Sequence, residues 1–475
     1  MRKLVLVLFL FGIWSSGIAQ KNSRPNIIWI VCEDMSQDLA CYGNPLVKTP
    51  FLDNLAKEGM RFTNMFTAAG VCAPSRTALA LGMHQNAVGA MHMRYSDELK
   101  PELPDGIKTI AHILQENGYQ TLGMGKHDYM FKQDKAPFQY TKMEELAPGK
   151  PFFAKVHSHY THRIFAKDDE NPIDRSKVTL PPYYPEVQPL REDYAAYLEN
   201  VQLLDKEIKE ILERFDKKGL LENTVIFFLS DHGSPTLKGK YWMYDSGIQV
   251  PFIIHVSKGM QIQGFEPGAV NNQLLSAIDI SATTLALAGV EKPAYLQGKM
   301  FLGEDMDEER EFIFASLDRI GGVNFKTRAV RSKKYKYIKN FNNGLSILEC
   351  STEYRKARLP HYNTISILDN YNKLNEVQKT LVTPLPLHEL YDLENDPHET
   401  INLAYKDEFK NIRNKYEDIL MNWIKQIDDK GMHPDAPEIQ EHFIQYRTNN
   451  KEMYRKERLQ VYKTIEDQLK RDGDI

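Results

Sequence analysis

A cysteine, a proline, a serine and an arginine stand together at the start of an apolar stretch, in VCAPSRTALALG (residues 71–82). Pro74 and Ser75 suit the first turn of a helix. Cys72 is therefore expected just before a helix N-terminus, where backbone N–H groups favour an anion. Arg76 adds a fixed positive charge with a fork of donors suited to an oxyanion. Such a cysteine can be a nucleophile of low pKa, a helix cap or a core residue.

Two other segments place acidic residues directly after a short apolar run. In RPNIIWIVCEDMS the run is followed by Glu33 and Asp34, and in NTVIFFLSDHGSP a second run is followed by Asp231 and His232. Short, β-branched runs of this kind favour buried strands. Clustered buried carboxylates are costly unless a cation compensates them. Oxygen-rich ligands favour Ca²⁺ or Mg²⁺. Taken singly, each pair is better explained as a loop cap or as partners in salt bridges, because acidic residues are common after strands.

Helical patterns lie between these two strands. Apolar residues recur at helical spacing from Ile107 to Leu114, and along a stripe from Tyr194 to Leu212. Buried strands alternating with amphipathic helices indicate an α/β sandwich around a large, mostly parallel sheet. Ligands of such sheets bind beyond the carboxyl ends of the strands, where these acidic residues are expected.

The pattern changes at about residue 312. RAVRSKKYKYIKN alternates charged and apolar residues, as a half-exposed antiparallel strand does, and residues 408–427 are again helical. We therefore expect a main domain over residues 21–311. A smaller α+β domain with an antiparallel sheet is expected over 312–475, ending in a charged tail that is a solvated helix or frayed.

Charge and targeting signals narrow the class of protein. Lys and Arg number 60 and Asp and Glu number 64, so a net charge of -4 argues against a nucleic-acid partner. Residues 1–20 have the basic start, short apolar run and small residues of a secretory signal. The run is too short for a comfortable membrane span. We expect an exported protein, periplasmic or secreted, without a membrane span in its mature form.

Cysteines are too few for a disulfide scaffold in a chain of 475 residues. A Cys41–Cys350 or a Cys32–Cys41 bridge remains open, but the fold is not expected to depend on one.

Several segments together resemble the formylglycine-dependent sulfatases. CAPSRTALALG resembles their signature C-x-P-S-R, in which the cysteine is oxidised during export to Cα-formylglycine by a dedicated maturating enzyme. RPNIIWIVCEDMS and SDHG resemble the two pairs of metal ligands, and ELYDLENDPHETINLA resembles a hallmark of the smaller domain. The resemblance covers nearly the whole chain after residue 20. It implies the alkaline-phosphatase-like fold, a catalytic domain over 21–311 and sulfate-ester hydrolysis.

The resemblance also implies one Ca²⁺ per chain, held by Glu33, Asp34, Asp231 and His232 together with residue 72. The family usually has Asp at the first of these positions and often Asn at the last. Glu33 keeps the charge with a longer reach, whereas His232 replaces an oxygen donor by nitrogen and would loosen selectivity for calcium.

Two lysines match the active-site positions of the family. GMGKHDYMF resembles its G-K-x-H segment, so Lys126 fits, but Asp128 stands where the family has His. His127 is displaced by one position and is equally compatible with a surface loop. Lys240 stands four residues before Tyr244, the spacing of the second lysine, and is preferred to Lys238.

The histidines of PFFAKVHSHYTHRIF supply the remaining catalytic candidates. The family has a sulfate-contacting histidine here, so His159 and His162 are the candidates, and His157 is expected to point away on the strand. In the implied mechanism a hydroxyl of the hydrated aldehyde attacks sulfur. Ca²⁺, Arg76, Lys126 and Lys240 stabilise the sulfuryl charge, and the histidine protonates the leaving oxygen.

The implied substrate is a sulfated polysaccharide or its oligosaccharides. HQNAVGAMHMRY resembles a segment of sulfamidase-type and related glycan sulfatases. Alternatives are an N-sulfoglucosamine sulfohydrolase and a catalytically impaired glycan-binding homologue. A phosphatase or phosphodiesterase is disfavoured, because those enzymes normally carry Ser or Thr as nucleophile. The residues expected to line the sugar pocket are His84, Gln85, His92, Arg94, Asp128, Asp318, Arg319 and Arg328.

Overall fold

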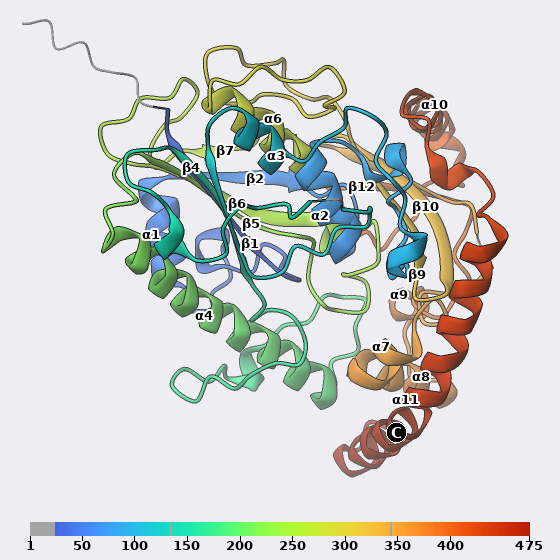
Figure 1. Cartoon of the computed structure of the whole chain (residues 1–475). Coiled ribbons are helices and arrows are strands. Elements are labelled where there is room, and N and C mark those ends of the chain that lie inside the picture. Colours follow the sequence, from blue (N-terminus) through green and yellow to red (C-terminus); the bar gives the residue numbers. More distant parts are fainter. Residues whose placement is uncertain (1–23, 134, 343) are drawn as a thin grey trace, which may run out of the picture.

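The computed structural model describes residues 24–133, 135–342 and 344–475, so the predicted signal segment at 1–20 lies outside the described residues. The described chain builds a large sheet with strand order β3-β4-β1-β5-β6-β2-β7, and β8 pairs with β2 (Figure 1). Strand β6 is antiparallel to β5 and β2, and the other pairings among these strands are parallel. The predicted mostly parallel sheet is confirmed. The strands are β1 (Asn26–Cys32), β2 (Met60–Phe66), β3 (Gln120–Met124), β4 (Phe152–Ser158), β5 (Thr224–Ser230), β6 (Gln249–Val256), β7 (Val270–Asn271) and β8 (Leu275–Ser276).

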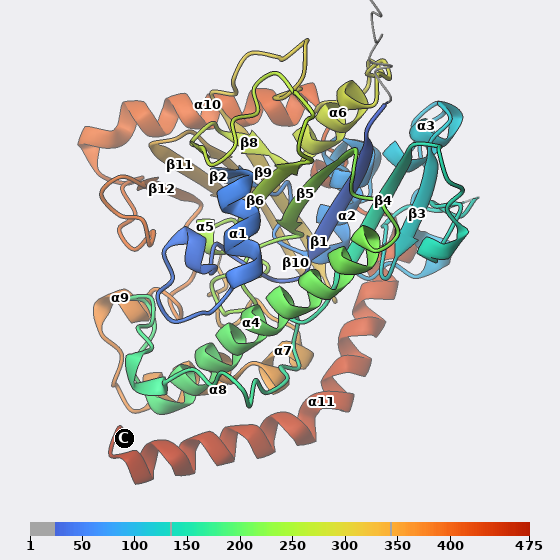
Figure 2. The ribbon, with the colours of Figure 1, turned by 90° about the vertical axis from the view of Figure 1, so that its left-hand side faces the viewer.

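Helices cover both faces of this sheet (Figures 1 and 2). Ile28 and Ile30 of β1 pack into a core with residues of α1 and α4, whereas the alternating Ile27 and Trp29 pack with residues of α3 and α6. Burial on both faces explains why β1 is apolar throughout. The helices of this part are α1 (Pro50–Glu58), α2 (Cys72–Leu81), α3 (Ile110–Glu116), α4 (Gln188–Asp216), α5 (Asp245–Ile248) and α6 (Ala277–Leu287).

A second sheet of four antiparallel strands, in the order β12-β11-β10-β9, begins at Ile313. The segment predicted as one charged strand forms the end of β10 and all of β11. The chain turns between them because the hydroxyl of Ser332 accepts the N–H groups of Lys334 and Tyr335. Helix α10 packs on this sheet, with Trp423 stacked on Phe314 at 4.8 Å between ring centroids. The strands and helices of this part are β9 (Ile313–Ile320), β10 (Val323–Arg331), β11 (Tyr335–Asn340), α7 (Glu353–Arg358), α8 (Pro360–Asn370), α9 (Glu376–Lys379), β12 (His388–Asp392) and α10 (Lys410–Gln426).

The chain ends in one long helix, α11 (Pro437–Asp472), which runs along the smaller sheet's side of the molecule (Figure 1). Most of α11 is exposed, but Phe443, Ile465 and Leu469 are buried, and the helix packs against α7 and α8. The tail predicted from about Lys451 to Asp474 lies almost entirely within this helix and is mostly exposed, as expected for a solvated helix, and Ile465 and Leu469 anchor it.

The thiols of Cys32, Cys41, Cys72 and Cys350 are all free, so neither of the two disulfides left open by the sequence is present. Within the described ranges, no helix combines the length and the apolar character needed to cross a membrane.

Candidate active site

The ends of β1 and β5 bring four polar side chains together. The two strands are parallel neighbours, and their register aligns the last residue of one with the last residue of the other. Glu33 and Asp34 therefore leave the sheet beside Asp231 and His232, and the Asp34 N–H donates to Asp231 Oδ1 at 3.1 Å. Asp34 adopts a φ of 52°, in the left-handed region that few non-glycine residues occupy. All four side chains are buried.

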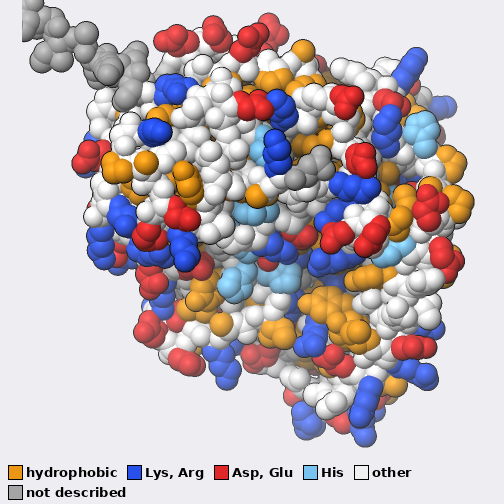
Figure 3. Space-filling view, viewed as in Figure 1, with side chains coloured by type: hydrophobic (Ala, Val, Ile, Leu, Met, Phe, Trp, Pro, Cys, Tyr) orange, Lys and Arg blue, Asp and Glu red, His pale blue; other side chains and the backbone are white. Residues whose placement is uncertain are grey.

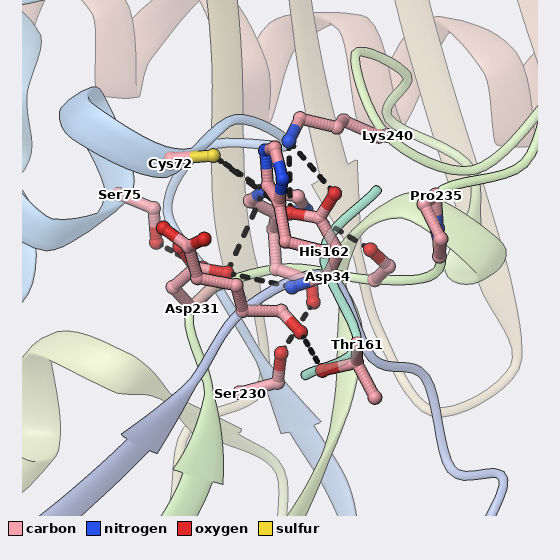
Figure 4. A network of polar contacts seen from close by, with 12 residues as sticks. Asp34, Cys72, Ser75, Thr161, His162, Ser230, Asp231, Pro235 and Lys240 are labelled. Carbon is pink, nitrogen blue, oxygen red and sulfur yellow. Dashed lines mark hydrogen bonds and ion pairs between the residues drawn. The ribbon is translucent and has the colours of Figure 1, made fainter. Parts of the chain in front are cut away.

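Cys72 faces this group from the N-terminus of α2 (Figure 4). It is the first residue of the helix, with Val71 as the N-cap, and not the residue before the helix as predicted. Its sulfur lies 3.1 Å from His232 Nε2 and 3.8 Å from Asp34 Oδ1. The nucleophile candidate and the metal-ligand candidates thus form one cluster.

Arg76, one turn into α2, holds two of the carboxylates. Its Nη2 lies 2.6 Å from Glu33 Oε1, and its Nε donates to Asp231 Oδ2 at 2.9 Å. The hydroxyl of Ser75 donates to the Asp231 carbonyl oxygen at 2.5 Å. Because the Arg76 side chain is fully buried against these carboxylates, it fixes their positions.

The two predicted lysines approach the same cluster. Lys240 Nζ lies 2.8 Å from both carboxylate oxygens of Asp34, and Lys126 Nζ lies 3.0 Å from Glu33 Oε1. Lys238 points elsewhere: it donates to the carbonyl oxygens of His398 and Glu399. The preference for Lys240 over Lys238 therefore agrees with the geometry.

Charges in the cluster hold its acidic groups ionised. Burial raises the pKa of Asp34, but the positive charges of Lys240, His162 and His232 outweigh this and keep the pKa well below its ordinary value. Burial lowers the pKa of His232, but the negative charges of Asp231, Cys72 and Asp34 raise it to about 10. The carboxyl of Asp34 and the imidazole of His232 are therefore both held in their charged forms.

The donor set is suited to a hard divalent ion. Ligand atoms of Asp34, Cys72 and His232 lie within 4.8 Å of one another, as do those of Glu33, Cys72 and Asp231. Residue 72 belongs to both groups, so an ion between them would contact that residue. Carboxylate oxygens dominate the set, which fits Ca²⁺ or Mg²⁺ better than a softer metal.

The histidines on and after β4 differ in position. His162 lines the cavity beside Asp34 and Lys240, whereas His159 is exposed and stacks on Tyr160. His157 was predicted to point away, but its Nε2 lies 3.4 Å from Glu33 Oε1, so that prediction is wrong. The side chain sits at the end of the strand, where Glu33 leaves the neighbouring strand β1.

Residues 127 and 128, which follow Lys126, make different contacts. The His127 ring packs on Phe138 at 4.5 Å between centroids, so His127 is half-buried within its loop. Asp128, where the family pattern has His, lies 3.4 Å from Lys126 Nζ. It therefore shares the lysine with Glu33.

A cavity of about 370 Å³ opens over Cys72. The face seen in Figure 3 has histidine, lysine and arginine side chains gathered near its middle. The far wall of the cavity comes from α7, α11 and the loop after Lys240, and the sequence carried no signal for this contribution. The cavity-lining residues that were not predicted include Tyr241, Thr352, Tyr354, Arg355, Tyr446 and Asn450.

Of the residues expected to bind the sugar, Arg94 lines this cavity. Most of the others make contacts within or between the segment after α2, the smaller sheet, α10 and the chain just before α11. The structure does not bring them to the cavity. Their contacts are His84 with the Trp423 ring, Gln85 with Ser316 (2.7 Å), His92 with Asp435 (2.7 Å), Asp318 with Arg328 (3.0 Å) and Arg319 with Asp435 (2.5 Å).

Comparison with known proteins agrees with this geometry. The family model described as Sulfatase matches residues 25–147 and 134–290, and that described as N-sulphoglucosamine sulphohydrolase, C-terminal, matches 233–350. An ulvan-active sulfatase of Formosa agariphila is 32% identical, over 87% of this chain and 77% of its own length. The N-sulphoglucosamine sulphohydrolase of Homo sapiens is 23% identical, and the similarity covers 86% of this chain and 91% of that protein's own length.

Solved structures share the fold. The structure of a 2-O GAG sulfatase superposes with a TM-score of 0.63 at 19% identity, covering 88% of this chain and 96% of that chain. The predicted alkaline-phosphatase-like fold, with its large mostly parallel sheet and smaller antiparallel one, is confirmed. On the strength of the family match and the 32% identical relative, this chain belongs to the sulfatase family and is a sulfuric ester hydrolase.

Proposed function

We propose that this protein is an exported sulfatase that hydrolyses sulfate esters of a sulfated polysaccharide or its oligosaccharides, with a nucleophile made from Cys72. One observation carries the proposal: Cys72, at the start of α2, faces a cluster of buried carboxylates and lysines at the inner end of a cavity. The similarity to an ulvan-active sulfatase supports a glycan as the substrate class.

The proposed cofactors are a calcium ion and a formylglycine at position 72. Glu33, Asp34, Asp231, His232 and residue 72 would hold the ion. Their three carboxylates are already balanced by Arg76, Lys126 and Lys240, so a divalent ion would leave surplus positive charge for an incoming sulfate. The hydrated aldehyde would supply an attacking hydroxyl and a second hydroxyl whose deprotonation expels sulfate.

The chain's own residues then have separate roles. Lys240 stands beside Cys72 in the cavity and would donate to a sulfuryl oxygen, with Lys126 on the other side of the cluster. Arg76 would hold Glu33 and Asp231 in place. His162 lines the cavity, so it would hold the proton that passes to the leaving oxygen of the sugar. His159, which is exposed, is the weaker of the two candidates.

A second candidate is an N-sulfoglucosamine sulfohydrolase, which cleaves an S–N bond. The match of residues 233–350 to the C-terminal model of that enzyme favours it. Parallel assays on N-sulfated and O-sulfated saccharides separate the two. We expect turnover of the O-sulfated substrates, and turnover of the N-sulfated ones alone would favour the alternative.

Mass spectrometry on the peptide that contains Cys72 tests the nucleophile. The protein should come from a host able to modify it, with Cys72→Ala as the control. We expect residue 72 as an aldehyde and a loss of desulfation in Cys72→Ala. An unmodified cysteine, together with undiminished activity in the variant, would overturn the proposal.

A further inference from the structure

Arg94 differs from the other arginines of the cavity. Among the described residues four arginines line this cavity, and three of them are engaged by carboxylates or carbonyl oxygens. No hydrogen bond or ion pair engages the Arg94 guanidinium in the described part of the chain, and the residue is exposed. The contacts of the other three are Arg163 with Asp193 (2.5 Å), Arg355 with the carbonyl oxygens of Thr236 and Lys240 (2.9 Å each) and Arg358 with Glu457 (3.2 Å).

The backbone around Arg94 is held from two sides. Its carbonyl oxygen accepts a hydrogen bond from His442 Nε2 of α11 at 2.8 Å, and the preceding Met93 N–H donates to the Arg319 carbonyl oxygen of β9 at 2.8 Å. Arg94 itself has a φ of 76°, a conformation that costs free energy in a bulky L-residue. Backbone strain at a residue that is held by hydrogen bonds on both sides and carries a charged side chain is typical of a binding site.

The surroundings of Arg94 join it to the reaction centre. Arg94 lines the same cavity as Cys72, Tyr241 and Tyr446. Partial burial lowers the pKa of its guanidinium, but nearby negative charge, that of Asp128 first, raises it overall. Asp128 makes no ion pair with Arg94, and its carboxylate lies 3.4 Å from Lys126 instead. Arg94 and Cys72 thus line one cavity without a carboxylate of the chain neutralising the guanidinium.

We propose that Arg94 binds a second anionic group of the substrate, a carboxylate or a second sulfate on the saccharide, while the sulfate to be removed lies at residue 72. This inference rests on the proposed function. A guanidinium presents a planar fork of donors that matches both kinds of oxyanion. The tyrosine rings of Tyr241 and Tyr446 line the same cavity and provide apolar faces for a sugar ring.

The test measures kcat/KM of the formylglycine-containing wild type and of Arg94→Ala. The substrates are a sulfated oligosaccharide that contains uronic acid, its carboxyl-reduced form, a disulfated saccharide without carboxylate, its monosulfated form, and 4-nitrophenyl sulfate. We expect Arg94→Ala to lower kcat/KM on a doubly anionic saccharide about 10- to 100-fold more than on 4-nitrophenyl sulfate.

The substrate pairs identify the group that Arg94 binds. If it is a carboxylate, carboxyl reduction lowers kcat/KM of the wild type by the same factor and has no further effect on Arg94→Ala. If it is a second sulfate, its absence from the monosulfated form lowers kcat/KM of the wild type by the same factor and has no further effect on Arg94→Ala. An equal loss on every substrate, including 4-nitrophenyl sulfate, would overturn the role of Arg94 while leaving the proposed function intact.

Three further variants keep the test decisive. Arg94→Gly relieves the backbone strain and should match Arg94→Ala, and Arg94→Lys, which keeps the charge without the fork, should recover part of the loss. Arg455→Ala removes an exposed charge on α11. It should keep the wild-type ratio of kcat/KM on a doubly anionic saccharide to kcat/KM on 4-nitrophenyl sulfate. A wild type that desulfates none of these substrates would overturn both the proposed function and this inference.

Discussion

The ammonium nitrogen of Lys240 lies 2.8 Å from each carboxylate oxygen of Asp34, and both side chains are buried. The two residues are far apart in the sequence, one directly after β1 and the other in the loop after β5. Their pairing brings a lysine within reach of residue 72 at the wall of the cavity. A buried pair of this kind is costly to break by removing one partner.

Lys240→Gln should therefore lose most of the activity. Removing one preorganised donor to a developing charge typically lowers kcat about 10²- to 10³-fold. Lys238→Gln is the matched control, since Lys238 is buried among backbone carbonyls two residues away. It should lower the free energy of unfolding by about 1–3 kcal/mol but keep the kcat of the folded fraction. Steady-state kinetics and denaturant unfolding measure both, and similar kcat values for the two variants would contradict the assignment.

The effect of His162→Ala should depend on the leaving group. A sugar alkoxide needs a proton to leave, so the variant should lose about 10²- to 10⁴-fold in kcat on saccharide sulfates, and far less on 4-nitrophenyl sulfate. His159→Ala, which alters an exposed side chain of the same loop, should have little effect on either substrate. Kinetics on both substrates checks this. The reverse ranking of the two variants would assign the proton donor to His159.

Removal of divalent ions should lower both activity and stability. Chelation should abolish desulfation, and added Ca²⁺ should restore it and raise Tm, because an ion that binds the folded state alone stabilises it by about 2.7 kcal/mol at 100 times Kd. Asp231→Asn removes one carboxylate and should shift both effects to higher Ca²⁺ concentration. Asp305→Asn, at an exposed carboxylate, should not. A Tm that is insensitive to Ca²⁺ in the wild type would argue against the ion.

Asp435 joins the start of α11 to the loop that carries Arg94. Burial raises its pKa, but the hydrogen bond from His92 and the charge of Arg319 lower it to about 2. A carboxyl whose pKa is lower in the folded state than in the unfolded chain stabilises the fold above the unfolded value. That contribution is lost as the pH falls towards 2.

Asp435→Asn should accordingly lower the free energy of unfolding at pH 7 by about 1–2 kcal/mol, after allowance for solvent screening. The difference in free energy of unfolding between the variant and the wild type should shrink as the pH falls below about 4, the ordinary pKa of Asp. Denaturant unfolding at pH 7, 5, 4 and 3 measures the gap. A gap that stays constant or widens on acidification would show that the charge of Asp435 is not the cause.

Local patterns in the sequence predicted the acidic half of the site. A short apolar run that ends in acidic residues identifies a buried strand and its carboxyl end, and parallel pairing then brings two such ends together. Pro74 and Ser75 predicted the start of the helix at Cys72 to within one residue. The orientation of His157 was not predicted, because at the end of a strand the position of the neighbouring strand decides which group the side chain meets.

The residue types thus indicated which side chains can attack, carry charge or hold an ion, and near which strand ends they lie, and the resemblance to sulfatases chose among the roles that these residues left open. The tertiary structure decided what shares the cavity with them. Tyr446 of α11 and Arg355 of α7 line the cavity, and α11 is held there by its packing on α7 and α8 and by its buried apolar residues such as Phe443 and Leu469. The same packing engages His92 and Arg319 with Asp435 and leaves Arg94 free. Long-range packing sums many weak contacts over the whole chain, so no short segment encodes it.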